Sequence, residues 1–305
     1  MIPTPRRVSA IALILFALTL SAPARDDSKP QVAPAPRARV TDVPNDLRGS
    51  LKLDPFYQKY ASAKGIPVLS SEKVSDKALV EAVYLINQML ADRDDIRQAL
   101  IKGKMRFVVM APTEMTTDVP EQRDMKPKDY WDRRARGLGG RVTSCGEENL
   151  LNLKGDRYNK ENILIHEFAH AIHQIGMRNV DPKFDARLRE TYKKAMDAGT
   201  WKDTYAATNH SEYWAEGVQA YFDCAAPPAR GVHNDINTRE KLKKADPDLF
   251  DLIDDVFKRS KFRYVRYDRR FAPEKADRDD RPGRGALAGA VGVSGVYRLV
   301  EAKPK

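Results

Sequence analysis

The sequence predicts an α+β fold in which a small sheet precedes a long, apolar helix. Residues Arg106–Ala111 form a compact β-type run, which is typical of a central strand. Apolar residues recur at helical spacing in Asp76–Leu90 before this run and in Phe184–Met196 after it. Residues Ile163–Ile175 contain neither glycine nor proline, and one face of this segment is apolar, as expected of a helix anchored in a core.

The first 24 residues have the features of an export signal. Arg6 and Arg7 precede the apolar stretch Val8–Ala22, and Ala22-Pro23-Ala24 is a small-residue cleavage site of the A-x-A kind. The apolar stretch is shorter than the ~20 residues that a membrane span needs. We therefore expect a signal peptide over residues 1–24, a secreted or periplasmic protein, and no transmembrane span in the mature chain.

The net charge of the chain indicates its possible partners, and its length indicates the number of domains. Removing the signal segment takes away two arginines and no acidic residue, so the formal net charge falls from +10 to +8. A basic balance favours anionic partners such as acidic substrates, cell-wall polymers or lipid head groups. Basic residues are mixed with acidic ones along the chain, which argues against nucleic-acid binding. The length suits one domain and is short for two.

Composition sets the expected domain limits. Residues 25–50 are rich in proline, alanine and charge and show no apolar period, which predicts a disordered linker. The folded domain is expected to span residues 51–270. Residues 271–305 combine a charged, breaker-rich stretch with a small apolar one and are expected to form a loose tail.

Further elements are predicted around the central strand. Ser75 is placed to cap the helix at Asp76–Leu90, and Gly176 is expected to end the helix at Ile163–Ile175. Arg141–Leu153 offers two short extended pieces, one of which could be an edge strand that pairs with a substrate backbone. The remaining predictions are helices at Ile96–Ile101, His210–Phe222, Arg239–Ala245 and Pro247–Phe257 and a closing strand at Lys261–Tyr267.

The helix at 163–175 carries a metal-binding pattern. His166 and His170 are four residues apart, so both imidazoles leave one helix face about one turn apart. Two such nitrogens can bind one Zn²⁺ at about 2.0–2.1 Å each. Glu167 follows the first histidine and can accept a proton from an attacking water. This His-Glu-x-x-His arrangement is that of zinc metallopeptidases; the alternative is a buried helix whose histidines are held by hydrogen bonds.

A third ligand must come from elsewhere in the chain. His173 lies seven residues after His166, ~10 Å further along the helix axis, and is expected to support the site or line its wall. Glu212 and Glu216 are four residues apart on the helix that begins near Asn209. Carboxylates beside buried aromatic residues are costly unless paired, and a metal would pair with one of them. The alternative is that Glu212 completes a capping box with Asn209.

These two segments resemble the lethal-factor-type zinc metallopeptidases, a gluzincin-like group that includes secreted Pro-Pro endopeptidases. In that family an H-E-F-x-H helix is followed by a tyrosine, six residues, and the zinc-binding glutamate of an E-[FY]-[FW]-A-E run. His166–His170 and Glu212–Glu216 match these motifs, and Tyr205 falls at the tyrosine position. The resemblance does not extend to the toxins' receptor-binding and substrate-docking domains, so it implies nothing about substrate specificity.

The resemblance implies a zincin-like domain with one Zn²⁺ per chain, bound by His166, His170 and Glu212. Glu216 would support these ligands, and Tyr205 would donate a hydrogen bond to the oxyanion of the tetrahedral intermediate. The expected activity is a secreted zinc metallopeptidase that acts on a peptide or protein substrate. Two alternatives stay open: another zinc hydrolase, such as an amidase acting on cell-wall peptides, and a non-catalytic binding module that keeps the scaffold.

The chain has two cysteines, Cys145 and Cys224. An even count in an exported protein favours a disulfide. The bridge would close a loop of about 80 residues and could contribute ~4 kcal/mol through chain entropy. The alternative is a pair of unbridged buried thiols.

Overall fold

The computed structural model describes residues 38–271, and these confirm the α+β class. The expected signal peptide at 1–24, the first half of the expected linker (residues 25–37) and the tail from residue 272 lie outside the described residues. One mixed sheet has the strand order β1-β2-β3-β4-β6-β5. Its strands are β1 (Thr41–Asp42), β2 (Lys59–Ala63), β3 (Ile66–Ser70), β4 (Arg106–Met110), β5 (Gly137–Leu138) and β6 (Val142–Gly146).

The helices alternate with these strands at first and then follow them. The helices up to the metal-binding motif are α1 (Asn45–Leu51), α2 (Asp76–Met89), α3 (Asp94–Lys102), α4 (Lys128–Arg134), α5 (Glu147–Leu150) and α6 (Ile163–Ala171). After it come α7 (Arg178–Val180), α8 (Phe184–Asp197), α9 (His210–Tyr221), α10 (Arg239–Ala245), α11 (Pro247–Phe257) and α12 (Tyr267–Arg270). The 3₁₀-helices are η1 (Thr116–Asp118), η2 (Pro120–Gln122) and η4 (Tyr205–Thr208), and η3 (Ile172–Met177) is a π-helix.

The centre of the sheet is parallel and its margins are antiparallel. β4 lies between β3 and β6 and runs parallel to both, which confirms Arg106–Ala111 as the central strand. β2 and β3 form an antiparallel hairpin whose turn holds Lys64 and Gly65 at positive φ. Two positive φ angles in a two-residue turn match the twist of a hairpin. The sequence analysis did not predict this hairpin.

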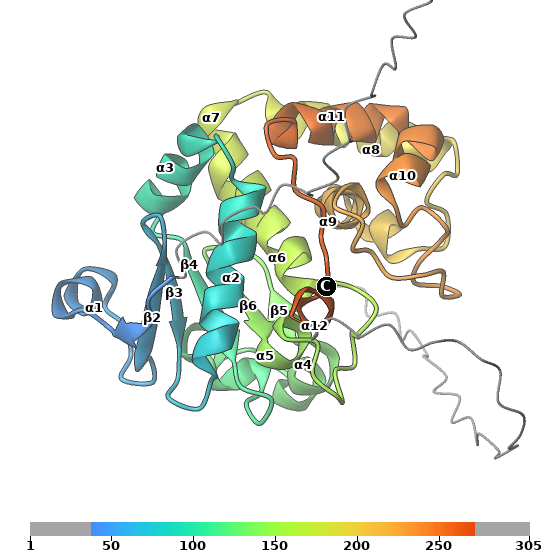
Figure 1. Ribbon diagram of the computed structural model, residues 1–305. Helices are drawn as coiled ribbons and strands as arrows, with labels where there is room; N and C mark the ends of the chain where they lie inside the picture. The colour runs from blue at the N-terminus through green and yellow to red at the C-terminus, as the bar shows by residue number, and fades with distance from the viewer. Residues whose placement is uncertain (1–37, 272–305) are drawn as a thin grey trace, which may run out of the picture. The chain divides into compact units, whose positions relative to one another are not determined.

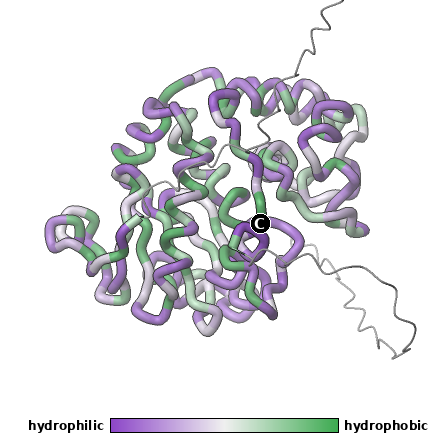
Figure 2. Tube along the Cα trace, viewed as in Figure 1, coloured by the Kyte–Doolittle hydropathy of each residue, from purple (hydrophilic) through white to green (hydrophobic). Residues whose placement is uncertain are grey.

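The two faces of the sheet are covered differently, because side chains alternate along each strand. Val68, Phe107 and Val109 belong to the large core shared with α2 and α6. Their neighbours Leu69 and Val108 belong to a smaller cluster on the other face, completed by Val43, Leu53, Tyr57, Met110 and Val119. In Figure 1 α2 crosses the sheet, and α6 begins beside β6; Figure 2 shows the hydrophobic stretches gathered along these strands and helices.

The second half of the chain packs around α9. Helices α6, α8, α10 and α11 all contact α9, and Figure 1 shows α8, α10 and α11 on the opposite side of the molecule from β2 and β3. Trp214 of α9 is fully buried, with its ring 5.1 Å from that of Phe184 and 6.0 Å from that of Phe257. Its Nε1 donates to the Ala169 carbonyl oxygen at 2.9 Å, which ties α9 to α6.

Most predicted helices agree with the structure, including α10 and α11 to the residue. Ser75 caps α2 by accepting from the Lys77 N–H at 3.3 Å. The prediction that the helix after Ile163 ends at Gly176 is wrong, because helical structure continues from α6 through η3 and α7 to Val180. A Cβ on Gly176 would lie 2.7 Å from Cγ2 of Ile96, so this glycine permits close packing against α3 instead.

Three other expectations differ from the structure. The fold starts before residue 51, with β1 and α1, because Val43 and Leu53 are buried in the smaller cluster. The prediction of a second extended segment within Arg141–Leu153 is wrong, because α5 follows β6 directly. The strand at this edge of the sheet is β5, which precedes β6 in the chain. The segment 261–266 is not a strand but an irregular stretch before α12, and within it the Tyr264 N–H donates to the Phe222 carbonyl at 3.0 Å.

The predicted disulfide is also wrong. Cys145 and Cys224 are both buried and unbridged. Cys145 lies on β6 and Cys224 follows α9, and α6 packs against both of these elements. Cys224 instead donates from Sγ to the Gln219 carbonyl at 3.4 Å.

Within residues 38–271, none of the helices has the length and apolar character required to cross a membrane.

The unbridged cysteines give a direct test of this packing. Protein denatured without reductant is expected to react with two equivalents of a thiol reagent per chain. The native protein should react slowly, because burial raises the pKa of both thiols and the thiolate is the reactive form. The same titration after reduction is the control. A thiol signal that appears only after reductant would contradict the structure.

Candidate metal centre

Two asparagines hold the start of α6. Asn162 caps the helix by accepting from the Ile165 N–H at 2.9 Å. Asn149 Oδ1 accepts from the Ile163 N–H at 2.8 Å, and its amide nitrogen donates to the carbonyl oxygens of Tyr158 and Glu161 at 3.0 Å. A cap of this kind stabilises a helix by about 1 kcal/mol. These bonds fix the helix that carries His166 and His170.

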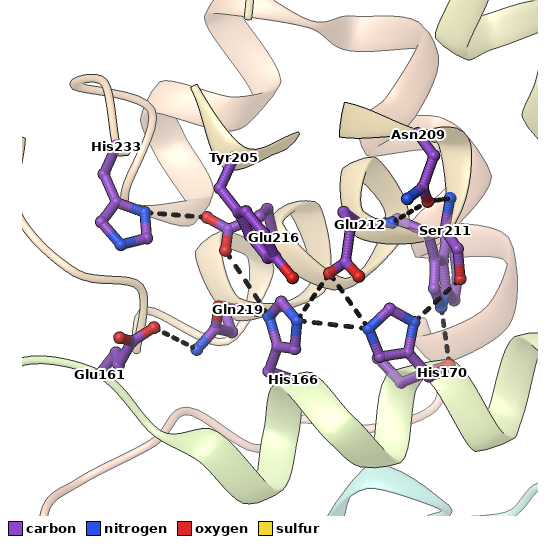
Figure 3. Close-up of polar contacts among 12 residues, drawn as sticks. Glu161, His166, His170, Tyr205, Asn209, Ser211, Glu212, Glu216, Gln219 and His233 are labelled. Carbon is purple, nitrogen blue, oxygen red and sulfur yellow. Dashed lines mark hydrogen bonds and ion pairs between the residues drawn. The ribbon is translucent and has the colours of Figure 1, made fainter. Parts of the chain in front are cut away.

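His166, His170 and Glu212 converge, as the sequence predicts (Figure 3). The Oε2 atom of Glu212 lies 3.1 Å from Nε2 of His166 and 3.3 Å from Nε2 of His170. The two imidazole Nε2 atoms are 3.3 Å apart. Three donor atoms gathered this closely from two helices can surround one cation.

The start of α9 aims Glu212 at this point. Asn209 caps α9 and accepts from the N–H groups of Ser211 and Glu212 at 2.9 and 3.0 Å. Glu212 is therefore the third residue of the helix, the position of a capping-box glutamate. Its carboxylate lies against the two imidazoles of α6, as a shared metal site would require.

The outer nitrogens of both imidazoles have partners. His166 Nδ1 lies 3.0 Å from Gln219 Oε1, and His170 Nδ1 lies 2.9 Å from Ser211 Oγ. The Gln219 amide nitrogen donates to the Asn162 carbonyl at 3.1 Å and to Glu161 Oε2 at 3.2 Å, which fixes its oxygen toward His166. Because Gln219 Oε1 only accepts, His166 carries a proton on Nδ1, and its Nε2 faces the converging side chains, where it could bind a cation after releasing its own proton.

Burial and charged neighbours shift the pKa values of Glu212, His166 and Glu167 in different directions. Burial alone would raise the pKa of Glu212, but hydrogen bonds and charge from His166 and His170 hold it well below its usual range. Burial would lower the pKa of His166, and the bond to Glu212 and the nearby carboxylates raise it instead. Glu167 has its pKa raised, first by burial, which makes it a stronger base.

Tyr205 lies over the site from η4. Its ring stacks on that of His166, with centroids 6.3 Å apart and planes 29° apart. Arg134 of α4 donates from Nη2 to the Tyr205 hydroxyl oxygen at 3.3 Å. Burial, followed by the charge of Glu212, raises the pKa of Tyr205, so its hydroxyl keeps its proton. The hydroxyl can therefore accept from Arg134 and still donate to a substrate.

Glu216 contacts two histidines. Its Oε1 is 3.6 Å from His166 Nδ1, and its Oε2 is 3.1 Å from His233 Nδ1. Sequence reasoning missed His233, Gln219, Ser211 and Arg134. Gln219 and Ser211 share a helix with Glu212 and could have been found from that spacing. Arg134 and His233 come from distant segments without a motif.

The edge strand β5 and Gly139, which follows it, pack directly on α6. A Cβ on Gly137 would lie 2.5 Å from Ile163 Cγ2 and 3.0 Å from Glu167 Cγ. A Cβ on Gly139 would lie 2.5 Å from His170 Cβ. The two glycines therefore let the edge of the sheet approach Glu167 and His170, a function that the sequence analysis did not assign to them.

His173 does not lie with this group, although the sequence analysis placed it beside the site. Its Nε2 lies 2.8 Å from Asp185 Oδ1, and its ring is 5.7 Å from that of His210. Burial lowers the pKa of His173 to about 4, so the imidazole is neutral. His173 belongs to a separate group of side chains.

Comparison with known proteins adds little to this geometry. No protein-family model matches the sequence, and no curated protein matches it. A solved structure that is similar is the Pro-Pro endopeptidase of Paenibacillus alvei, with 20% sequence identity and a TM-score of 0.45. The match covers 64% of this chain and 100% of that chain.

The close approach of β5 to α6 predicts that Gly139→Ala damages the site. The new Cβ would meet the rigid Cβ of His170, so the helix or the strand must shift. We expect a loss of about 1–3 kcal/mol in the free energy of unfolding and weaker zinc binding in a competition titration with a chelator. Gly49→Ala is the matched control, because a Cβ there meets nothing within 4 Å. Unchanged stability and zinc affinity in Gly139→Ala would refute this packing argument.

Proposed function

We propose that this chain is a zinc-dependent peptidase that hydrolyses peptide bonds in peptide or protein substrates. The observation that carries the proposal is the convergence of His166, His170 and Glu212 beside a half-buried Glu167. Residues 1–24 lead us to propose further that the protein acts outside the cytoplasm, in the periplasm or the extracellular medium.

The donor set fits Zn²⁺. Two imidazoles and one carboxylate are the ligands of many catalytic zinc sites, which keep a fourth position open. The outer nitrogens of both histidines are hydrogen-bonded, as they are in known zinc sites. When bound, Zn²⁺ would polarise the substrate carbonyl and lower the pKa of a water toward ~7.

Glu167 is suited to move the proton in this reaction. It follows His166 on α6, and its raised pKa favours proton acceptance from the attacking water. The same carboxyl group then donates that proton to the leaving amine. Gly137 packs against Glu167 Cγ and restricts where the side chain can lie.

Tyr205 and Arg134 are suited to stabilise the oxyanion. Arg134 donates to the Tyr205 oxygen, which leaves the phenolic proton free to point at the substrate carbonyl. The positive charge of Arg134 strengthens Tyr205 as a donor, because it attracts electron density from the phenol oxygen. β5 ends the sheet next to α6, so an extended substrate could pair with this edge.

The general-base role predicts that Glu167→Gln keeps zinc and loses hydrolysis. The amide has the same shape but cannot accept the proton, so we expect kcat to fall by a factor of about 10²–10⁴. Zinc content by elemental analysis and cleavage of a proteome-derived peptide library are the two measurements. Glu212→Ala is the matched comparison, since it should lose zinc as well as activity.

Near-normal cleavage by Glu167→Gln would exclude Glu167 as the base. Absence of any cleavage by the wild-type, zinc-loaded protein across the library would count against a peptidase.

The oxyanion role predicts that Tyr205→Phe lowers kcat by a factor of about 10²–10³, which corresponds to the loss of one oxyanion donor. KM should change little, because the hydrogen bond forms in the transition state. Steady-state kinetics on a library-derived peptide would measure both constants. Tyr57→Phe is the control, because it removes a hydroxyl that bonds Glu121 and Tyr57 belongs to the smaller cluster on the other face of the sheet. Equal kcat in Tyr205→Phe and wild type would remove Tyr205 from the chemistry.

A further inference from the structure

A second group of metal-type donors lies next to the candidate zinc site. Its members are His173 of η3, Asp185 in the first turn of α8 and His210, the first residue of α9. Asp185 Oδ1 is 2.8 Å from His173 Nε2 and 3.4 Å from His210 Nε2. One donor atom from each of the three residues lies within 4.8 Å of the others.

The two groups have similar internal geometry. The rings of His173 and His210 are 5.7 Å apart with planes 81° apart, and those of His166 and His170 are 5.0 Å apart with planes 77° apart. In both groups a carboxylate oxygen lies between two Nε2 atoms. The second group thus repeats, with aspartate in place of glutamate, the two-histidine, one-carboxylate set that suits zinc.

A π-helical segment places His173 beside the other two side chains. The helix after α6 widens into the π-helical η3, and His173 faces α8 and α9 from this segment. Single π-helical turns inside helices are uncommon and occur frequently at functional sites. His173 is fully buried, whereas Asp185 and His210 keep partial exposure, with side chains 23% and 18% exposed. An ion could therefore reach this group from the partly exposed side of Asp185 and His210.

Arginines also contact Asp185, and they leave one oxygen for a cation. Arg189 Nε pairs with Oδ2 at 2.9 Å, on the oxygen that does not face the histidines. Arg178 approaches Oδ1 at 3.6 Å, but its side chain is 52% exposed and can move into solvent. Asp185 can therefore bind an ion through Oδ1 while Arg189 orients the carboxylate.

We propose that His173, Asp185 and His210 bind a second divalent transition-metal ion of the zinc class. The ion would join η3, α8 and the first turn of α9. Ser211 and Glu212 directly follow His210 and reach His170 and the first site, so the second ion would fix the turn that presents them. Binding of the second ion does not depend on the proposed peptidase activity. The role of that ion in positioning Ser211 and Glu212 rests on the proposed function.

Metal stoichiometry tests the proposal with Zn²⁺ itself as the probe. Full-length protein is stripped with a chelator, loaded with excess ZnCl₂, freed of unbound ion and measured by elemental analysis. We expect two zinc ions in wild type, one in His210→Gln, one in Asp185→Asn and one in the double variant His166→Gln/His170→Gln. The double variant with His210→Gln added should bind none.

Arg178→Gln is the matched control, because it removes a neighbour of Asp185 and no ligand. It should keep two zinc ions, and its second ion should bind more tightly than in wild type. Circular dichroism establishes that each variant is folded, and His210→Gln, at a partly exposed position, stands in if Asp185→Asn does not fold. In the double variant zinc should raise the melting temperature, and adding His210→Gln should abolish that rise.

One zinc ion in saturated wild type, or two in His210→Gln, would overturn the second site. Neither result bears on the peptidase proposal, which fails separately if zinc-loaded wild type cleaves no peptide. Two zinc ions without any cleavage would support the second site and reject the peptidase.

Discussion

The packing of α9 against α6 is the contact on which the candidate site depends. His166 and His170 lie on α6 and Glu212 lies on α9, so the three donors meet only if the two helices keep one register. The buried Trp214 sets that register, with its ring in the core and its Nε1 bonded to the Ala169 carbonyl. The close contact of donors is therefore a consequence of hydrophobic packing, with hydrogen bonds that add direction.

Gln219 links the packing of α9 against α6 to the orientation of the His166 ring. It bonds the Asn162 carbonyl at the start of α6, Glu161 beside it, and the outer nitrogen of His166. Since both amide hydrogens of Gln219 have acceptors, its oxygen can only face the imidazole. The start of the helix, the orientation of His166 and the tautomer of its ring are thus linked through one buried side chain.

All five histidines of the chain belong to one connected region. His166 and His170 face Glu212, His233 holds the far side of Glu216, and His173 and His210 share Asp185. The first turn of α9 joins the two groups, because His210, Ser211 and Glu212 follow one another in the chain. Gly137 and Gly139 let the edge of the sheet approach α6, and this close packing leaves Glu167 and His170 little freedom to move.

The sequence by itself determined what depends on local spacing. The four-residue interval of His166 and His170, the apolar periods of the long helices and the run at Arg106–Ala111 each follow from one short segment, and the structure agrees with them. The tertiary structure decided what depends on how segments pack. In it, Cys145 and Cys224 stay unbridged, although the elements next to both pack against α6. The helical chain also continues past Gly176, and His173 lies with Asp185 and His210 instead of the first site. Those outcomes rest on contacts between residues distant in the chain, which no local period encodes.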